Sequence, residues 1–410
     1  MTIAAMPPSV RVLVCPSGFK GSLQPGKAAD CIEAGILSVE PNALVRKVPL
    51  VDGGEGFTQA LVAATKGTIH NISVTGPIGK PVESFFGILG QTSTMTEPKT
   101  AVIEMAAAAG LSLVPPDCRK PGITTTYGVG QLILAAIEAG AQRLLVGCGD
   151  SGTCDGGAGM LQALGARLID RDGYIIPEAG GGESLIGLSN IDLSGIDSKL
   201  RNLPISAAVN WHNVLCGPRG VAAVFGPQKG ATEEQIARLS TAMDALARVA
   251  GTLLQDDNVG LSPGSGASGG LGTGLRLIGT KLRPRYDLVM EYLSLEGLFD
   301  ECDLVLTAEG GIDNQTPMGK IPGEIARRAK KHNLPVIAIA GTIGTGARVN
   351  YTIGIDAYAC ILQRPTTLER AVQEAERLTT ESAESVMRLI SIGRVMEIGN
   401  GTGITQVKNI

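Results

Sequence analysis

The chain has 410 residues, of which 44% are hydrophobic and 18% are charged, a composition typical of a folded protein rather than a disordered one. Its length predicts more than one domain. The formal net charge of −4 provides no basic field for a phosphate backbone, so no nucleic-acid partner is expected. The eight cysteines form no CxxC pair, no apolar run is long enough to cross a membrane, and the first residues do not resemble a signal peptide. These features predict a reduced, cytoplasmic protein that does not bind membranes.

The first 75 residues alternate between short apolar strands and helical periods. Strands are expected at 11–15 and 45–50, and helices near 27–39 and 57–65. This order of elements favours a parallel sheet whose functional loops follow the strands.

The middle of the chain, from about Gly76, has a different pattern. Two antiparallel strands are expected first, followed by a helix, a buried strand, a second helix and a stretch rich in loops, at 81–89, 101–105, 128–139, 143–147, 157–164 and 167–206. Residues 232–254 are predicted to form a long helix, because Thr232 and Gln235 make a capping box at its start.

The last part of the chain returns to alternating strands and helices. Strands are expected at 303–307, 336–340 and 357–362, with a helix at 323–331 and a final helix capped by Thr366 with Glu369. Both ends of the chain therefore look doubly wound, whereas the middle does not. The expected fold class is α/β with two α/β domains: a discontinuous doubly wound domain of residues 1–75 plus 285–410, and an inserted domain of residues 76–284.

Two acidic, glycine-containing turns follow predicted strands. Asp52-Gly53-Gly54-Glu55-Gly56 places two carboxylates where they can bind magnesium or accept a proton, although a helix-capping turn explains this motif equally well. The second turn contains Glu309, Asp313 and, at its end, Lys320. Two carboxylates and a lysine after a buried strand supply the metal ligands and the compact positive charge that phosphoryl transfer requires.

Other glycine-rich segments suggest different chemistry. Gly147–Gly152 fits the GxGxxG pattern, and a nicotinamide-dependent dehydrogenase is therefore an alternative function. Against it, Asp150 places a carboxylate where a pyrophosphate would approach. Residues 264–274 suit an anion-binding nest or a flexible linker. His212 is a candidate general base, but a lone histidine beside a tryptophan is more often structural.

Eight segments in order resemble the bacterial-type glycerate kinases. They extend from near residue 11 to about residue 390 and comprise 19–23, 52–56, 74–77, 103–108, 155–159, 225–231, 266–270 and 309–320. The resemblance implies two α/β domains with the active site in the cleft between them, ATP and Mg²⁺ as co-substrate and metal, and conversion of D-glycerate to 2-phosphoglycerate. A homo-oligomer is compatible with this interpretation.

The resemblance and the two acidic turns together give a set of expected site residues. We expect Lys20, Asp52 and Asp313 to be catalytic, and Asp52, Glu309 and Asp313 to hold the metal. The residues expected to bind substrate or nucleotide are Ser22, Gly53, Gly54, Glu55, Asp155, Gly156, Gly157, Asn210, His212, Asn213, Gly266, Gly269, Gly270, Gln315 and Lys320.

The chain departs from the family pattern at several positions. Ser17-Gly18 stand where an Asp-Ser pair is usual, Asn210 lies in a block that usually contains Asp, and Gly311 replaces an Arg. Asp150 and Cys154 replace a Gly and an Asn. An Arg that holds a carboxylate is worth roughly 1.5–3 kcal/mol, so its loss would change the acceptor. A different hydroxy acid as acceptor, or a non-catalytic relative that only binds ligand, is therefore an alternative.

Overall fold

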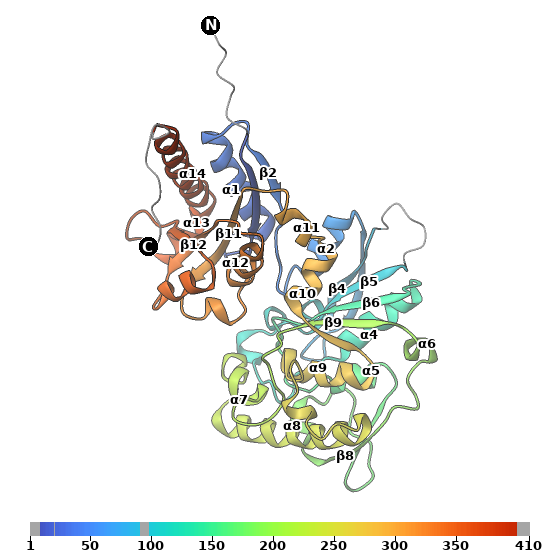
Figure 1. Cartoon of the computed structure of the whole chain (residues 1–410). Helices are drawn as coiled ribbons and strands as arrows, with labels where there is room; N and C mark the ends of the chain where they lie inside the picture. The colour runs from blue at the N-terminus through green and yellow to red at the C-terminus, as the bar shows by residue number, and fades with distance from the viewer. Residues whose placement is uncertain (1–8, 20, 91–97, 400–410) are drawn as a thin grey trace. The chain divides into compact units, whose positions relative to one another are not determined.

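The structure, a computed structural model, describes residues 9–19, 21–90 and 98–399 (Figure 1). The chain divides into two compact units: unit 1, drawn from Met1–Leu50 and Ser294–Ile410, and unit 2, Val51–Leu293. Unit 2 is thus inserted into a discontinuous unit 1. Residues 51–75 and 285–293, which were expected in the discontinuous domain, belong to unit 2. In the first segment β3 (Thr68–Thr75) pairs with β4 (Pro81–Ile88), and in the second a helix packs on the unit 2 sheet.

Unit 1 is built on a five-stranded, fully parallel sheet in the order β13-β12-β11-β1-β2. Its strands are β1 (Arg11–Pro16), β2 (Leu44–Lys47), β11 (Leu304–Ile312), β12 (Val336–Ile343) and β13 (Ala357–Cys360). The strand order reverses between β1 and β11, where Val14 pairs with Leu306. In open α/β sheets of this kind, ligands bind outside the carboxyl ends of the strands at such a reversal.

Helices cover both faces of the unit 1 sheet. Val12 and Val14 of β1 pack in one core with α1 (Pro25–Val39) and α14 (Ala375–Gly399), while α12 (Ile321–Lys331) packs on β11 and β1. The shorter helices are α11 (Glu296–Phe299), η6 (Thr316–Met318), η7 (Ala347–Ile353) and α13 (Leu368–Gln373).

The expected cap of the last predicted helix is wrong by one residue. The hydroxyl of Thr367, rather than that of Thr366, accepts a hydrogen bond from the backbone N–H of Arg370 (3.4 Å). Thr367 is the last residue with extended backbone before α13, and its hydroxyl can therefore reach the free amides of the first helical turn.

Unit 2 contains a six-stranded mixed sheet in the order β10-β9-β6-β5-β4-β3. The strands not yet given are β5 (Thr100–Glu104), β6 (Arg143–Gly147), β9 (Ile205–Val209) and β10 (Lys281–Pro284). These four run parallel, whereas β4 is antiparallel to β5, which confirms the antiparallel pair expected at 81–89 and 101–105.

The segment 167–206, expected to be loops, contains more regular structure than its sequence indicates. It forms the hairpin β7 (Arg167–Asp170) and β8 (Leu188–Asp192) and the start of β9. The strand β9 lies between β6 and β10. Its residues are mostly small, so its apolar signal is weak even though Ala207, Ala208 and Val209 are fully buried.

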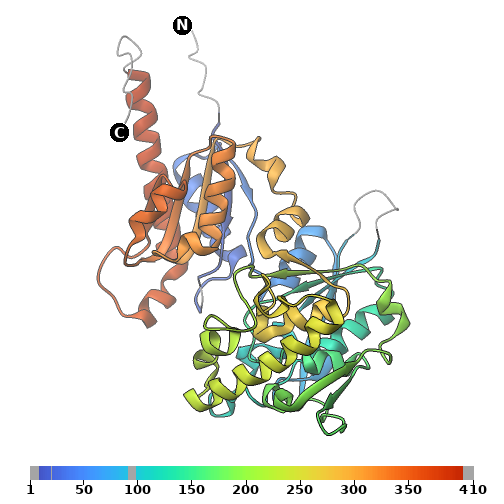
Figure 2. The ribbon, with the colours of Figure 1, turned by 60° about the horizontal axis from the view of Figure 1, so that its bottom comes forward.

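The unit 2 sheet is also covered on both faces (Figures 1 and 2). On one face lie α4 (Tyr127–Glu138), α5 (Ala158–Ala163) and α9 (Ala267–Leu277), with α8 (Glu233–Leu254) packed on α9; on the other lie α2 (Phe57–Thr65) and α10 (Arg285–Tyr292). The remaining helices are α3 (Ala106–Ala109), η1 (Leu111–Leu113), η2 (Pro116–Cys118), η3 (Gly182–Gly187), α6 (Ser198–Arg201), α7 (Val221–Phe225), η4 (Pro227–Lys229) and η5 (Val259–Leu261). The capping box of α8 is confirmed, since Thr232 and Gln235 exchange both expected hydrogen bonds.

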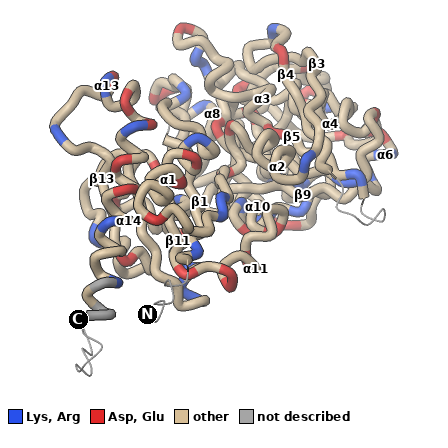
Figure 3. The backbone as a smooth tube through the Cα atoms, turned by 90° about the horizontal axis from the view of Figure 1, so that it is seen from above, with Lys and Arg blue, Asp and Glu red and all other residues tan. Residues whose placement is uncertain are grey.

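Each unit therefore has the α/β architecture that the sequence predicts. Within the described ranges, no helix combines the length and the apolar character needed to span a membrane. Basic and acidic residues are interspersed along both units (Figure 3).

Two groups of candidate active-site residues

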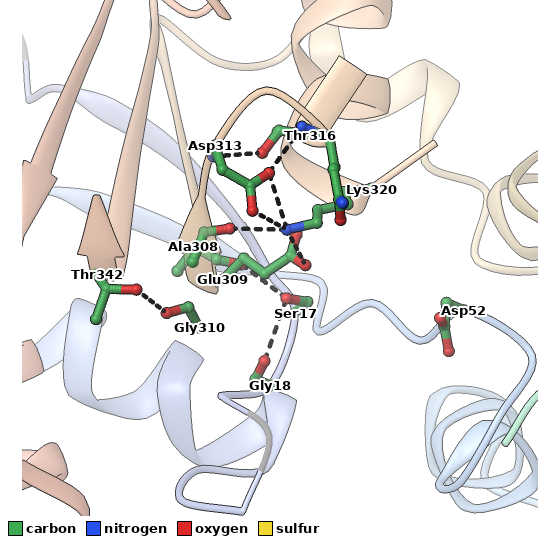
Figure 4. Close-up of polar contacts among 12 residues, drawn as sticks. Ser17, Gly18, Asp52, Ala308, Glu309, Gly310, Asp313, Thr316, Lys320 and Thr342 are labelled. Atoms are coloured by element: carbon green, nitrogen blue, oxygen red, sulfur yellow. Dashed lines mark hydrogen bonds and ion pairs between the residues drawn. The ribbon is translucent and has the colours of Figure 1, made fainter. Parts of the chain in front are cut away.

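In unit 1, three charged side chains meet at the carboxyl end of β11 (Figure 4). The ammonium Nζ of Lys320 lies 3.4 Å from both carboxylate oxygens of Asp313 and 3.9 Å from Oε1 of Glu309. All three side chains are between 21% and 29% exposed. One cation thus holds two partly buried carboxylates together beside the strand reversal, where a ligand is expected to bind.

The loop after β11 fixes these side chains through its own hydrogen bonds. Oδ1 of Asp313 accepts a bond from the backbone N–H of Gln315 (2.8 Å), and the backbone N–H of Asp313 donates to the hydroxyl of Thr316 (3.1 Å). Asn350, on η7, donates to the backbone carbonyl of Asp313 (2.9 Å). Gln315 thus takes part in this group through its backbone N–H, and the residue is exposed to solvent.

The loop after β1 reaches the same end of the unit 1 sheet. Both the backbone N–H and the hydroxyl of Ser17 donate to the carbonyl of Ala308, at 2.8 Å and 3.0 Å, and this ties β1 to β11. The second of these bonds depends on the hydroxyl proton of serine, which a carboxylate lacks. The hydroxyl of Ser22 is buried and has no hydrogen-bond partner in the described part of the chain. Lys20 lies outside the described residues.

In unit 2, the turn Asp52–Gly56 passes close to the backbone at the carboxyl ends of β6 and β9. Gly53 has φ +89°, and a Cβ on it would lie 3.3 Å from the carbonyl oxygen of Ala208. A Cβ on Gly54 would lie 2.2 Å from Oδ2 of Asp150. That carboxylate also accepts a hydrogen bond from the backbone N–H of Glu55 (3.1 Å). The glycines are therefore required for this close contact.

Each carboxylate oxygen of Asp52 has its own donor. Oδ1 accepts a hydrogen bond from the backbone N–H of Gly54 (3.3 Å), and Oδ2 accepts one from Nη1 of Arg285 (2.9 Å). The side chain of Asp52 is 47% exposed, whereas that of Arg285 is 16% exposed. Asp52 is therefore an accessible carboxylate held in one orientation by a guanidinium that is itself largely buried.

A buried acid supports the same turn at the end of β5. Glu104 is 3% exposed, and its Oε2 accepts a hydrogen bond from the backbone N–H of Thr58 (3.0 Å), at the start of α2. The pKa of Glu104 is raised to about 7, chiefly by burial; backbone donors oppose this shift, and the nearby charges of Glu55 and Asp150 add to it.

The turn after β9 contains three of the expected binding residues. The side-chain oxygen of Asn210 accepts a hydrogen bond from the backbone N–H of His212 (3.1 Å), and its backbone carbonyl accepts one from the N–H of Asn213 (3.2 Å). An aspartate would make the same turn, so Asn210 keeps the geometry and removes a charge. His212 is exposed.

Asp155 has a different environment from the other candidate acids. It is fully buried, and its carboxylate accepts hydrogen bonds from Thr126, Gly157 and Gly159 at 2.8 to 3.2 Å. Burial raises its pKa, and these donors counteract that shift. Its position indicates that it organises the loop before α5.

The glycines expected to form an anion-binding nest pack against that same loop. The backbone N–H of Gly156 donates to the carbonyl of Gly269 (2.9 Å), and a Cβ on Gly269 would lie 2.0 Å from the carbonyl of Thr153. A Cβ on Gly270 would lie 2.8 Å from Cα of Gly156. Gly266 donates its N–H to the carbonyl of Asn213 (3.2 Å). Close packing of backbone on backbone thus accounts for these glycines.

Lys229 is a buried cation beneath the same loops. It is 3% exposed, and its ammonium donates to the hydroxyl of Ser151 (2.8 Å) and to the carbonyl of Thr153 (2.6 Å). Burial lowers the pKa of Lys229 to about 8, although the charges of Cys154 and Asp155 oppose this.

The segment Gly147–Gly152 does not have the form of a dinucleotide-binding turn. Helix α5 begins only at Ala158, so no helix follows these glycines directly. A Cβ on Gly149 would lie 2.5 Å from Cα of Gly54, which shows that this glycine accommodates the neighbouring turn.

Comparison with known proteins connects both units to one family. The model of the glycerate kinase family matches residues 12–391. The chain belongs to the glycerate kinase family. This membership confirms the resemblance inferred from the eight segments and makes the chain a kinase-type phosphotransferase.

Relatives in this family are similar over almost their whole length. The chain is 44% identical to glycerate kinase of Bacillus subtilis (strain 168), with 94% of this chain and 99% of the relative covered. It is 41% identical to glycerate 2-kinase of Escherichia coli (strain K12), again with 94% and 99% covered. The crystal structure of a putative glycerate kinase 2 from Salmonella typhimurium LT2 matches with a TM-score of 0.78 and 41% identity, covering 94% of this chain and 99% of that one.

The side chains in the unit 1 group suit a magnesium ion bound together with a phosphate. Carboxylates such as Glu309 and Asp313 are the protein ligands that Mg²⁺ prefers, and the ion usually takes its remaining ligands from phosphate and water. The described residues contain no group of three or more His, Cys, Asp or Glu side chains that could hold a metal ion by themselves. Asp52, the third expected metal ligand, belongs to unit 2.

Sequence reasoning missed three residues that support these groups. Glu104 lies inside one of the eight segments, and the overlooked signal is a lone acid at the end of an apolar strand. Lys229 lies in another of these segments and, like Glu104, is buried. Arg285 follows β10, a short strand whose sequence has no clear apolar pattern, and only its contact with Asp52 makes it visible.

Proposed function

We propose that this chain is an ATP- and Mg²⁺-dependent kinase that phosphorylates D-glycerate to 2-phosphoglycerate. The observation that carries the proposal is the group of Glu309, Asp313 and Lys320 at the carboxyl end of a strand in a parallel sheet. The E. coli relative, named glycerate 2-kinase, supports the 2-position as the site of phosphorylation.

The unit 1 group would bind the charged end of the nucleotide. Glu309 and Asp313 would hold Mg²⁺, which neutralises the charge that develops on the phosphoryl oxygens when it is bound. Lys320 adds a compact positive charge for the same oxygens, and its contact with both carboxylates keeps the ammonium in place.

Asp52 is the residue we assign as the proton acceptor. Its side chain is 47% exposed, compared with 29% for Asp313, and Arg285 holds it in one orientation. In the reaction, the hydroxyl proton of glycerate passes to Asp52, and the hydroxyl oxygen forms a bond to the γ-phosphorus of ATP. The bond from this phosphorus to the bridging oxygen breaks, and ADP leaves with that oxygen.

The direct test is to measure ADP release and to identify the product. The purified full-length chain is incubated with Mg-ATP and D-glycerate, ADP is followed by a coupled assay, and ³¹P NMR distinguishes 2- from 3-phosphoglycerate. L-Glycerate is the stereochemical control. We expect one equivalent of 2-phosphoglycerate for each ADP released.

Variants then test the assigned residues. Asp52→Asn and Lys320→Met are each expected to lower kcat by about 100-fold or more, because each removes a group that acts on charge in the transition state. Asp300→Asn is the matched control, since Asp300 is 73% exposed and contacts His332 instead of the site. Absence of turnover by the wild type, or full activity in both Asp52→Asn and Asp313→Asn, would contradict the proposal.

The same assays test the alternative raised by Gly311, a relative that binds ligand without transferring phosphate. Its signature would be a higher Tm in the presence of Mg-ATP, with no transfer to D-glycerate or to a panel of other small hydroxy acids.

A further inference from the structure

Arg285 is a charged residue that none of the recognised segments contains, yet its side chain reaches the acidic turn of unit 2. It is the first residue of α10 and directly follows β10, the edge strand that pairs with β9. Pro284 precedes it and restricts the backbone at this point. The backbone of Arg285 is therefore fixed at the carboxyl end of β10.

The guanidinium is held on two sides. Its Nη1 lies 2.9 Å from Oδ2 of Asp52, and its Cζ lies 4.7 Å from the ring centroid of Tyr286, in a cation–π contact. The ring of Tyr286 is itself buried, and only 16% of the Arg285 side chain is exposed. A guanidinium fixed in this way can restrict the orientation of the carboxylate to which it binds.

The contact leaves Asp52 accessible but limits its rotation. One carboxylate oxygen is bound to the loop's own amide at Gly54, and the other is bound to Arg285, while 47% of the side chain remains exposed. Three further acids, Glu55, Asp150 and Glu104, surround this turn. Arg285 therefore places a positive charge beside an acidic turn and binds Asp52 directly.

We infer that Arg285 is a positioning residue that holds the carboxylate of Asp52 in the orientation needed to accept the proton of the acceptor hydroxyl. This inference rests on the proposed function, in which Asp52 is the proton acceptor. Displacing a reacting group by about 1 Å can cost on the order of 100-fold in rate, so the orientation of one carboxylate can decide turnover.

The test compares Arg285→Gln, Arg285→Lys and Arg285→Ala with a neighbouring control. Arg283→Gln removes an arginine from the same strand region, where Arg283 forms a surface pair with Glu291 (2.7 Å). We expect Arg285→Gln to lower kcat by about 10- to 100-fold while KM for D-glycerate and ATP changes by less than about 3-fold. Arg285→Lys should recover part of kcat, added guanidinium ion should partly restore Arg285→Ala, and Arg283→Gln should behave as wild type.

A double variant shows whether Arg285 acts through Asp52. Because a positioning residue has no effect once its target is removed, Asp52→Asn with Arg285→Gln should be no slower than Asp52→Asn alone. If the two effects multiply, or if Arg285→Gln lowers Tm without rescue by lysine or guanidinium, a merely structural role is indicated and the inference is overturned.

Three other outcomes locate the failure elsewhere. A rise in KM for D-glycerate of about 10-fold or more with kcat unchanged would show that Arg285 binds the acceptor instead of positioning Asp52. If wild type turns over but Asp52→Asn is fully active, the assignment of the base fails and the inference fails with it. If wild type shows no transfer at all, the proposed function itself is refuted.

Discussion

The buried acid Glu104 should make unit 2 less stable as the pH rises from 4.5 to 7. Its pKa in the folded chain is about 7, compared with an ordinary value of 4.5. The folded state therefore binds this proton more tightly than the unfolded state. The stabilisation is complete below pH 4.5 and is lost as the pH rises towards 7. A difference of 2.5 units corresponds to about 3 kcal/mol.

Replacement of Glu104 by Gln should remove this dependence. The glutamine side chain keeps an oxygen that can accept the N–H of Thr58, but it does not ionise. We expect the variant to gain stability relative to wild type as the pH rises from 4.5 to 7, up to about 3 kcal/mol, and to keep that advantage above pH 7.

Urea unfolding followed by tryptophan fluorescence measures this effect. The chain has a single tryptophan, Trp211, which lies in unit 2, so the signal reports that unit. Glu83→Gln, on the exposed side of β4, controls for the loss of one carboxylate. A constant difference in unfolding free energy between Glu104→Gln and wild type from pH 4.5 to 8 would refute the argument.

Three further predictions follow from close packing and burial. Gly35→Ala should destabilise unit 1 by roughly 1–3 kcal/mol in circular-dichroism melts, because its Cβ would lie 2.4 Å from a carbonyl oxygen of α14. Gly26→Ala, in the same helix but with open space around it, should not destabilise it. Lys229→Met should cost unit 2 roughly 1–3 kcal/mol by fluorescence-monitored unfolding, since it leaves the hydroxyl of Ser151 and the carbonyl of Thr153 without their buried donor; an unchanged midpoint would contradict this. Cys148 and Cys154, whose pKa values burial raises to about 12 and about 11, should resist iodoacetamide at pH 8 in the folded protein, and mass spectrometry that finds them alkylated would argue against that burial.

Strands with large apolar side chains could be predicted from the sequence, and strands without them could not. The run at 143–147 is β6, but Ile205–Val209, also an interior strand of the sheet, was not found because serine and alanine carry little apolar signal. The strand Thr68–Thr75 was also missed. It is an edge strand that pairs only with β4, and most of its residues are exposed, so it has no run of buried apolar residues. That omission also displaced the expected domain boundary.

The candidate site was predictable where residues close in sequence form a group. Glu309, Asp313 and Lys320 are close in sequence, from the end of β11 to the start of α12, so their spacing was informative. The partner of Asp52 was not predictable, because Arg285 is 233 residues away and only the folded sheet brings the two together. Likewise, the sequence shows a glycine but not whether its space is taken by a ligand or by another backbone, as at Gly269.

The discontinuous make-up of unit 1 has a consequence for how the protein is made. Strand β1 pairs on one side with β2, but its other partner, β11, is encoded about 290 residues later, as the pairing of Val12 with Leu304 shows. During synthesis β1 therefore cannot pair with β11 until residues 304–312 have been made. The uninterrupted unit 2 can fold as soon as it emerges from the ribosome. A nascent chain arrested far enough past residue 293 for unit 2 to leave the exit tunnel should accordingly carry a protease-resistant unit 2 behind a protease-sensitive leading segment.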